Sequence, residues 1–291
     1  MKGGALMSST NHVLNGFFTQ SVFLEMSTKS KNHSIYDAII RRFLSSTENK
    51  DNATLINEIY TFMSKSYRNE YFYQNTLLNK LLLGKHSLKT TTALSQIPIA
   101  KSKADFILIN GKAVVYEIKT ELDSFERLEH QLQDYFKAFD HVCIVTSEKQ
   151  YERAKQMLSS TPVGIYVLTS QNTISQKYRQ EPIGDNTYLD YTTIFKVLRK
   201  YEHENILIQY YGQLPITSQV FYYEACLEWF SKIPVQTAYT LMLAQLKNRN
   251  QCHLSNFRDV PYELKSLVYF SKTLKTNWNS INNFLSQKYG G

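Results

Sequence analysis

A two-residue turn between two apolar runs constrains the fold of this chain more than any other feature. The runs cover residues 104–108 and 113–118 and contain Ile, Val, Phe and Tyr, which favour strands. Asn110-Gly111 stands between them, and this pair favours the positive φ angles of a tight hairpin turn. The sequence therefore predicts an antiparallel hairpin, and with it a sheet, in the middle of the chain.

The segments that follow the hairpin extend this sheet. Apolar residues recur at helical spacing over residues 124–139, and apolar runs at 141–146 and 163–168 are typical of buried strands. A second helix is predicted between those strands, over residues 148–158. The order strand, strand, helix, strand, helix, strand predicts an α/β fold of three layers, α/β/α, in which helices cover both faces of a mixed sheet.

Helical patterns flank this central region on both sides. Residues 1–33 show little periodicity and are predicted to form a loosely ordered arm. A polar connection over residues 171–187 marks a boundary. We therefore expect three parts: an N-terminal arm with helices over residues 1–67, a core over 68–170 and a helical C-terminal region over 171–291. Further helices are predicted over residues 34–44, 51–63, 69–83, 188–201, 217–230, 235–248 and 261–274.

Composition excludes several classes of protein. Hydrophobic residues make up 43% of the 291 residues, which is typical of a globular chain and not of a disordered one. The chain has no run of about 18 apolar residues, and its start lacks the apolar core of a secretory signal. We therefore expect a cytoplasmic protein without a membrane span. The three cysteines, Cys143, Cys226 and Cys252, lack zinc-ligand spacing and fit a reducing compartment.

The distribution of charge is more informative than the net charge of +8. Residues 1–100 carry 11 basic and 6 acidic side chains, and residues 171–291 carry 13 and 9, whereas residues 101–170 carry 9 and 10. Basic flanks suit a polyanionic partner, because lysines and arginines near phosphates release counterions. Carboxylates in the middle would repel that partner unless a cation lay between them.

Three charged residues of the hairpin supply such a cation site. Asp105 opens the first strand, and Glu117-Ile118-Lys119 ends the second. Because side chains alternate across a strand, Glu117 and Lys119 project to one face while Ile118 points to the other. An antiparallel hairpin brings Asp105 beside Glu117. The sequence therefore predicts two carboxylates and an ammonium in one site.

That combination suits the hydrolysis of a phosphodiester. Two carboxylates bind Mg²⁺, or Mn²⁺ in its place, and leave positions for water and a phosphate oxygen. The cation polarises the phosphate and lowers the pKa of a bound water, and the lysine orients that water or offsets negative charge. The alternative for Glu117 and Lys119 is a solvated ion pair at the end of a surface hairpin.

With these residues the chain resembles the PD-(D/E)XK, or restriction-endonuclease-like, nuclease superfamily. Ala104-Asp105 stands where the family has Pro-Asp, and Glu117-Ile118-Lys119 matches its second element. Gln131 and Tyr135, four residues apart on one helix face, resemble the Gln-x-x-x-Tyr element of the RecB-type branch. The resemblance covers roughly residues 68–170. It implies a core of restriction-endonuclease type and catalytic roles for Asp105, Glu117, Lys119, Gln131 and Tyr135.

The resemblance also implies ligands and contacts around this centre. Several branches of the superfamily supply another acidic residue from an upstream helix, and Glu70 is the candidate here, so the implied metal ligands are Glu70, Asp105, Glu117 and Ile118. Lys101 and Lys103 precede Asp105, and Arg127 lies one turn before Gln131. These three are candidates to contact the phosphates of DNA.

We therefore expect a magnesium-dependent deoxyribonuclease, of a kind found in phage defence and mobile elements. Two alternatives stay open: cleavage of RNA by the same site, since nothing here tests for a 2′-hydroxyl, and a nucleic-acid-binding or assembly protein that keeps the fold without catalysis. The C-terminal region carries no recognised motif. It would hold DNA, a partner or a second copy of the chain.

Overall fold

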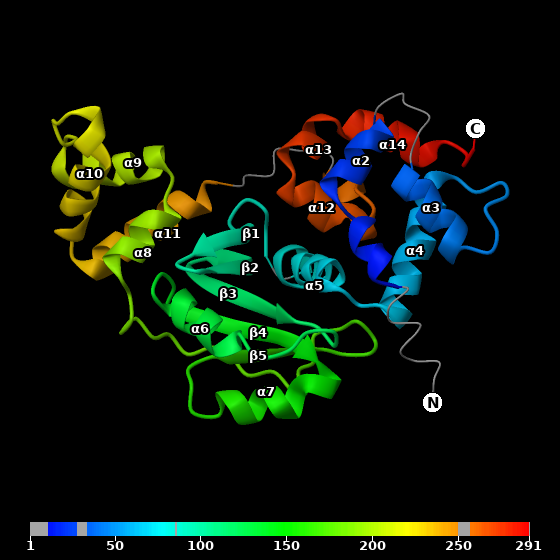
Figure 1. Ribbon diagram of the computed structural model, residues 1–291, viewed down its shortest axis with the longest axis horizontal. Coiled ribbons are helices and arrows are strands. Elements are labelled where there is room, and N and C mark those ends of the chain that lie inside the picture. The colour runs from blue at the N-terminus through cyan, green and yellow to red at the C-terminus, as the bar shows by residue number, and fades with distance from the viewer. Residues whose placement is uncertain (1–10, 28–33, 85, 250–256, 291) are drawn as a thin grey trace. The chain divides into compact units, whose positions relative to one another are not determined.

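The computed structural model describes residues 11–27, 34–84, 86–249 and 257–290, and these form two compact units (Figure 1). One unit joins the described residues up to Gly84 with those from Phe257 onward, and the other comprises residues 86–249. These limits differ from the expected boundaries after residues 67 and 170. Residues 171–249 pack with the sheet, and the C-terminal helices pack with the N-terminal ones.

A five-stranded mixed sheet forms the centre of the second unit (Figure 1). The strands follow one another in space as in sequence, and the first three are antiparallel whereas the third, fourth and fifth are parallel. This confirms the prediction of a mixed α/β fold. The strands are β1 (Thr92–Ile99), β2 (Ser102–Asn110), β3 (Lys112–Lys119), β4 (His141–Ser147) and β5 (Gly164–Leu168).

The hairpin of β2 and β3 forms as the sequence predicts, but only Gly111 of the Asn110-Gly111 pair has a positive φ. Gly111 has a φ of 73°, which only glycine adopts without steric cost, and Asn110 pairs with Lys112 across it. Strand β1 was not predicted. It lies at the edge of the sheet, where a proline, Pro98, is tolerated near the end of the strand, and its polar centre at Ser95 and Gln96 hides the apolar alternation.

Two helices connect the parallel strands, and their apolar sides lie against the same face of the sheet. Helix α6 (Leu128–Phe136) joins β3 to β4, and α7 (Tyr151–Leu158) joins β4 to β5 after the short 3₁₀ turn η3 (Glu148–Gln150). The hydrophobic cluster between these helices and the sheet contains alternate residues of β3, such as Ala113 and Val115, whereas Val114 and Tyr116 do not belong to it. Alternation places Glu117 and Lys119 on that same face, beneath α6.

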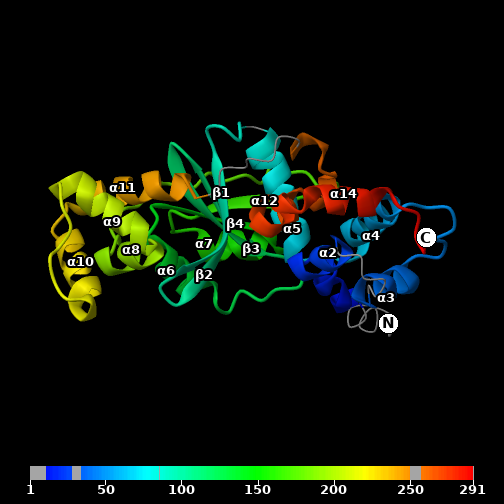
Figure 2. The same ribbon diagram turned by 90° about the horizontal axis from the view of Figure 1, so that it is seen from above.

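Four more helices complete the second unit. They are α8 (Tyr191–Val197), α9 (Lys200–Tyr211), α10 (Tyr222–Ser231), preceded by η4 (Gln219–Phe221), and α11 (Val235–Lys247). Figure 2 shows them gathered beside one another, and α8 packs on β1 while α11 packs on β2. A buried ion pair between Glu202 and Arg249 joins the start of α9 to the residues after α11.

The first unit is helical. Its elements are η1 (His12–Gly16), α2 (Gln20–Ser27), α3 (Ser34–Phe43), α4 (Asn52–Ser66), α5 (Glu70–Leu77), the π-helical turn η2 (Leu78–Leu83), η5 (Phe257–Asp259), η6 (Tyr262–Leu264), α12 (Lys265–Phe270), α13 (Lys272–Thr276) and α14 (Trp278–Ser286). None of the described helices is long and apolar enough to cross a membrane.

The prediction of a loosely ordered arm is wrong for residues 11–27. Phe17, Phe18 and Phe23 are at most 5% exposed there, and their rings contact one another. Tertiary packing orders this stretch although its periodicity is weak. The rest of the predicted arm, residues 1–10 and 28–33, lies outside the described residues.

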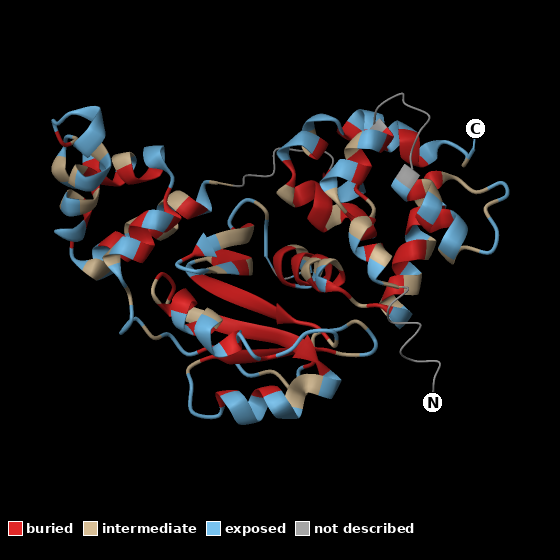
Figure 3. Cartoon of the chain, in the orientation of Figure 1, coloured by how far each residue is buried: buried red, intermediate tan, exposed pale blue. Residues whose placement is uncertain are grey.

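Burial is greatest along the parallel strands. Figure 3 shows β3, β4 and β5 in the colour of buried residues along almost their whole length. This includes both charged residues at the end of β3, since Glu117 is 2% exposed and Lys119 is 7% exposed. The two therefore form a buried pair and not the solvated pair of the alternative reading.

Candidate metal and nucleic-acid site

Asp105 lies where the ladder between β2 and β3 ends. The last main-chain pair joins Phe106 to Tyr116. Beyond that pair the Asp105 side chain, in place of a main-chain carbonyl, is the acceptor: the Ile118 main-chain N–H donates to Asp105 Oδ2 at 2.8 Å. This hydrogen bond fixes Asp105 next to the segment that carries Glu117.

A residue of the unpredicted strand β1 also contacts this carboxylate. Gln96 Nε2 donates to Asp105 Oδ1 at 3.4 Å. The main chain of Gln96 has a φ of 56°, in the left-handed region, which is costly for a residue with a side chain. The sequence offered no signal for this contact, since β1 was not recognised.

Glu117 and Lys119 lie side by side under α6. Glu117 Oε1 is 3.0 Å from Lys119 Nζ. Both side chains come from alternate positions of β3, so the geometry follows from the pleat of the strand. Their burial means that neither charge is neutralised by water, and each depends on protein groups for compensation.

Gln131 of α6 bridges this ion pair. Its Nε2 donates to Glu117 Oε1 at 2.6 Å, and its Oε1 accepts from Lys119 Nζ at 2.8 Å. One amide therefore satisfies an acceptor and a donor at once, which fixes the orientation of all three side chains.

Tyr135, one turn after Gln131, donates a hydrogen bond to the other oxygen of the Glu117 carboxylate. Its hydroxyl lies 2.5 Å from Glu117 Oε2, to which it donates, and 3.0 Å from the Lys103 carbonyl oxygen. Burial raises the pKa of Tyr135, and the negative charge of Glu117 raises it further, so the hydroxyl keeps its proton. The predicted pair on one face of α6 thus meets the predicted pair on β3.

Carboxylate oxygens are the ligands that a hard divalent cation such as Mg²⁺ takes from a protein. Asp105 and Glu117 supply two carboxylates to this part of the sheet. From Ile118 only the main-chain carbonyl could join them, because its side chain is apolar. Within the described chain no group of three or more His, Cys, Asp or Glu side chains is arranged to hold a metal. Two carboxylates are nonetheless what Mg²⁺ commonly takes from a protein.

Glu70, the remaining expected metal ligand, comes from a different part of the chain. It is the exposed first residue of α5 and belongs to the other unit of the chain. Its expected part in binding a metal stays a prediction.

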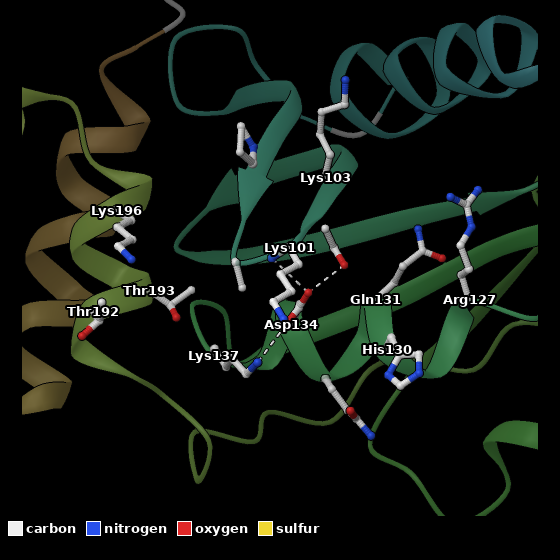
Figure 4. Close-up of a pocket in the computed structure, with 14 residues that line it drawn as sticks. Lys101, Lys103, Arg127, His130, Gln131, Asp134, Lys137, Thr192, Thr193 and Lys196 are labelled. Atoms are coloured by element: carbon white, nitrogen blue, oxygen red, sulfur yellow. Dashed lines mark hydrogen bonds and ion pairs between the residues drawn. The ribbon is translucent and has the colours of Figure 1, made fainter.

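A basic groove adjoins the site. Its volume is about 940 Å³, and all three residues expected to contact phosphates, Lys101, Lys103 and Arg127, line it. Gln131 lines it as well, and this residue connects the groove to Glu117 and Lys119. The other lining residues are Pro98, Ala100, Ser102, His130, Gln133, Asp134, Lys137, Thr192, Thr193 and Lys196 (Figure 4).

Asp134 links two segments that line the groove, the start of β2 and the end of α6. Its Oδ2 accepts from the Lys101 main-chain N–H at 3.2 Å and from Ser102 Oγ at 2.8 Å, and its Oδ1 pairs with Lys137 Nζ at 2.9 Å (Figure 4). Burial acts to raise the pKa of Asp134, but the hydrogen bonds from Lys137 and Ser102 outweigh burial and lower it. Asp134 is thus charged at neutral pH and fastens the turn before β2 to α6.

Sequence reasoning missed two cations of this groove, Lys137 and Lys196. Lys137 directly follows α6, one turn after Asp134 and two turns after His130, and a helical projection of the residues after the hairpin would have found it. Lys196 is on α8, in a region that carried no motif, so only the packing of α8 reveals it.

Comparison with known proteins identifies one family. A family model described as bacteriophage P4 protein cII matches residues 63–270, which include every residue of the site and the groove. Protein cII of Enterobacteria phage P4 is 27% identical over 217 residues, which cover 70% of this chain and 78% of that protein. No solved structure matches the chain.

Proposed function

This chain belongs to the bacteriophage P4 protein cII family, and from that premise and the site above we propose that it is a metal-dependent deoxyribonuclease. The observation that carries the proposal is the joint network of Glu117, Lys119, Gln131 and Tyr135 beside Asp105. A restriction-endonuclease-type core and a cytoplasmic location are parts of the same proposal. The phage source of the relative supports a role in a phage or another mobile element.

In this proposal Asp105 and Glu117 hold Mg²⁺ together with the Ile118 carbonyl. When bound, the cation would supply a water of lowered pKa and a Lewis acid for the phosphate. Lys119 places a positive charge where the phosphate gains negative charge. Gln131 and Tyr135 keep the Glu117 carboxylate oriented, so these two act as positioning residues.

The basic groove supports a polyanionic substrate. Lys101, Lys103 and Arg127 offer exposed cations on the approach to Glu117, and each phosphate that they contact releases counterions. The same residues would hold RNA, so an RNA substrate belongs in the test.

The test is cleavage of linear, circular and single-stranded DNA, and of RNA, with Mg²⁺ or Mn²⁺ and with EDTA. We expect cleavage that EDTA abolishes. Glu117→Gln and Lys119→Met should lower the rate on the order of 100-fold or more, because each removes a charge used at the reacting phosphate.

Two controls separate lost chemistry from lost folding. Glu129→Ala changes an exposed carboxylate of α6 outside the site and should leave the rate unchanged. Circular dichroism and DNA binding in EDTA should remain near the wild-type values in the two site variants. Undiminished cleavage in both of them would end the proposal.

One feature favours a second candidate, nucleic-acid binding without cleavage. Glu117 already accepts from Lys119, Gln131 and Tyr135, and the groove needs no metal to attract phosphate. Calorimetric titration with Mn²⁺ distinguishes the two functions. If the wild type binds Mn²⁺ and Asp105→Asn does not, the nuclease is supported. If neither the wild type nor Asp105→Asn binds Mn²⁺, the second candidate is supported.

A further inference from the structure

The groove beside the site has a second wall, which comes from the C-terminal helical region. Thr192, Thr193 and Lys196 of α8 line one side, and Lys101, Asp134 and Lys137 line the other (Figure 4). At least 54 residues separate the α8 wall from Lys137 and Lys101 in the sequence. The proposed reaction uses none of the α8 side chains.

Helix α8 is fixed beside α6 by its first residues. The Asp190 main-chain N–H donates to the Lys137 carbonyl at 2.9 Å, and the Asp190 carboxylate caps α8 by accepting from the Thr193 N–H at 2.7 Å. Phe195 and Val197 are buried in the core, so Lys196 between them faces outward. The position of Lys196 across from Lys101 is therefore set by packing and a cap.

The charge of the groove is strongly one-sided. Five lysine and arginine side chains and one carboxylate line it, which leaves a net charge of +4 with His130 neutral. Asp134 pairs with Lys137, whereas the side chains of Lys101, Lys103, Arg127 and Lys196 form no ion pair within the described chain. Four cations are thus available to an anionic ligand.

The shape and lining of the groove indicate how it would hold that ligand. A volume of about 940 Å³ is at the upper end for a small-molecule site, so the groove has room for a few nucleotides of one strand. No Phe, Tyr or Trp is among the lining residues, which all belong to the described chain. Only His130 and Arg127 could stack on a base, so recognition falls mainly to the phosphates.

We propose that this groove binds a single nucleic-acid strand by its backbone and that Lys196 of α8 holds one of its phosphates. The inference rests on the proposed function in one respect: it takes this strand to be the substrate. Gln131 lines the groove and contacts Glu117 and Lys119, so a strand in the groove would lie next to the site. It assigns to the C-terminal helical region a part in binding the strand.

The experiment measures binding of fluorescein-labelled (dT)₁₂ in EDTA by anisotropy at several salt concentrations. Removing one phosphate contact lowers the steepness of log K against log salt by about 0.7 for a single strand. We expect that change for Lys196→Gln, with affinity about fivefold weaker near 0.1 M salt, and about twice the change in slope for Lys101→Gln with Lys196→Gln.

The matched control is Lys112→Gln. Lys112 is also an exposed lysine, but it opens β3 at the far end from Lys119, roughly 23 Å along the strand. It should bind (dT)₁₂ as the wild type does. Circular dichroism should show that all variants are folded.

Two results would overturn the inference: wild-type affinity and salt slope in Lys196→Gln, or a duplex of the same length that binds as tightly as (dT)₁₂. Because these measurements need no metal, they are independent of cleavage. Binding that depends on Lys196 in a protein without cleavage would support the groove and overturn only the proposed function. Cleavage without such binding would overturn the groove alone.

Discussion

The Glu117 carboxylate is the most heavily constrained group of the candidate site. It is buried, pairs with Lys119 and accepts hydrogen bonds from Gln131 and Tyr135. Each partner fixes a different direction, so the carboxylate cannot rotate without losing one of them. In the proposed function this fixed orientation would serve to hold a cation.

Tyr135→Phe tests this positioning at the level of one hydroxyl. The change leaves Glu117 Oε2 without its donor, which should lower the free energy of unfolding by about 1–3 kcal/mol. The cleavage rate should fall about 10- to 100-fold with KM nearly unchanged, because the carboxylate would be less well oriented. Urea denaturation and steady-state kinetics measure the two effects.

Tyr151→Phe is the corresponding control. Tyr151 is half-buried and its ring packs at a tilt against that of Tyr178, and its hydroxyl makes no hydrogen bond within the described chain. Its removal should change neither stability nor rate appreciably. Equal kinetics in wild type and Tyr135→Phe would show that the hydroxyl does not position Glu117.

Helix α6 and the residues that flank it present three groups of side chains. Leu128, Leu132 and Phe136 pack into the core, and Gln131 and Tyr135 reach the site. A third group, comprising Arg127, His130, Asp134 and Lys137, lines the groove. The period of 3.6 residues separates these groups, so a single short helix links the core, the Glu117 carboxylate and the groove.

The cap of α8 is a test of the groove at the scale of an element. Asp190→Ala removes the acceptor for the Thr193 N–H and should lower the free energy of unfolding by about 1 kcal/mol. The start of α8 would fray, so binding of (dT)₁₂ in EDTA should weaken, by at most the roughly fivefold loss expected for Lys196 itself.

Asp51→Ala provides the comparison. Asp51 caps α4 in the same way, accepting from the Thr54 N–H at 2.8 Å, but it lies in the first unit. It should reduce stability by a similar amount and leave strand binding unchanged. Equal binding by Asp190→Ala and Asp51→Ala would mean that the order of α8 does not matter to the strand.

In the whole molecule, the candidate site belongs to one compact unit and the two ends of the chain belong to the other. The sheet, site and groove all lie in the second unit, whereas both ends of the chain contribute to the first. Asn52 joins those ends: it accepts from Tyr36 Oη at 2.8 Å and donates to the carbonyls of Phe284 and Gln287 at 3.0 and 3.2 Å. One buried amide thus connects helices that are more than 230 residues apart in sequence.

Asn52→Ala should destabilise one unit only. Loss of three buried hydrogen bonds should lower the free energy of unfolding of the first unit by about 2–4 kcal/mol. Hydrogen exchange should rise in α4 and α14 while β3 and α6 keep their protection, and the cleavage rate should stay the same. Asn283→Ala, an exposed change on α14, should alter neither. A parallel loss of protection in β3 would show that the two units unfold together.

The hairpin and the face of α6 could be predicted because both depend on local rules. Asn110-Gly111 fixes the turn, the pleat places Glu117 and Lys119 on one side, and four residues of helix place Gln131 and Tyr135 together. Strand β1 and the helices of residues 11–27 could not be predicted. Their polar or aperiodic sequences are ordered by burial against distant parts of the chain.

Local sequence patterns predict which charged residues share a face of the hairpin and which helix covers them, because backbone geometry over a few residues sets both. That Lys196 faces Lys101, that Gln96 contacts Asp105 and that Asn52 joins the two ends of the chain is known only from the folded molecule. Those contacts depend on how whole elements pack, and packing is set by the fit of buried side chains from distant segments, which no local pattern records.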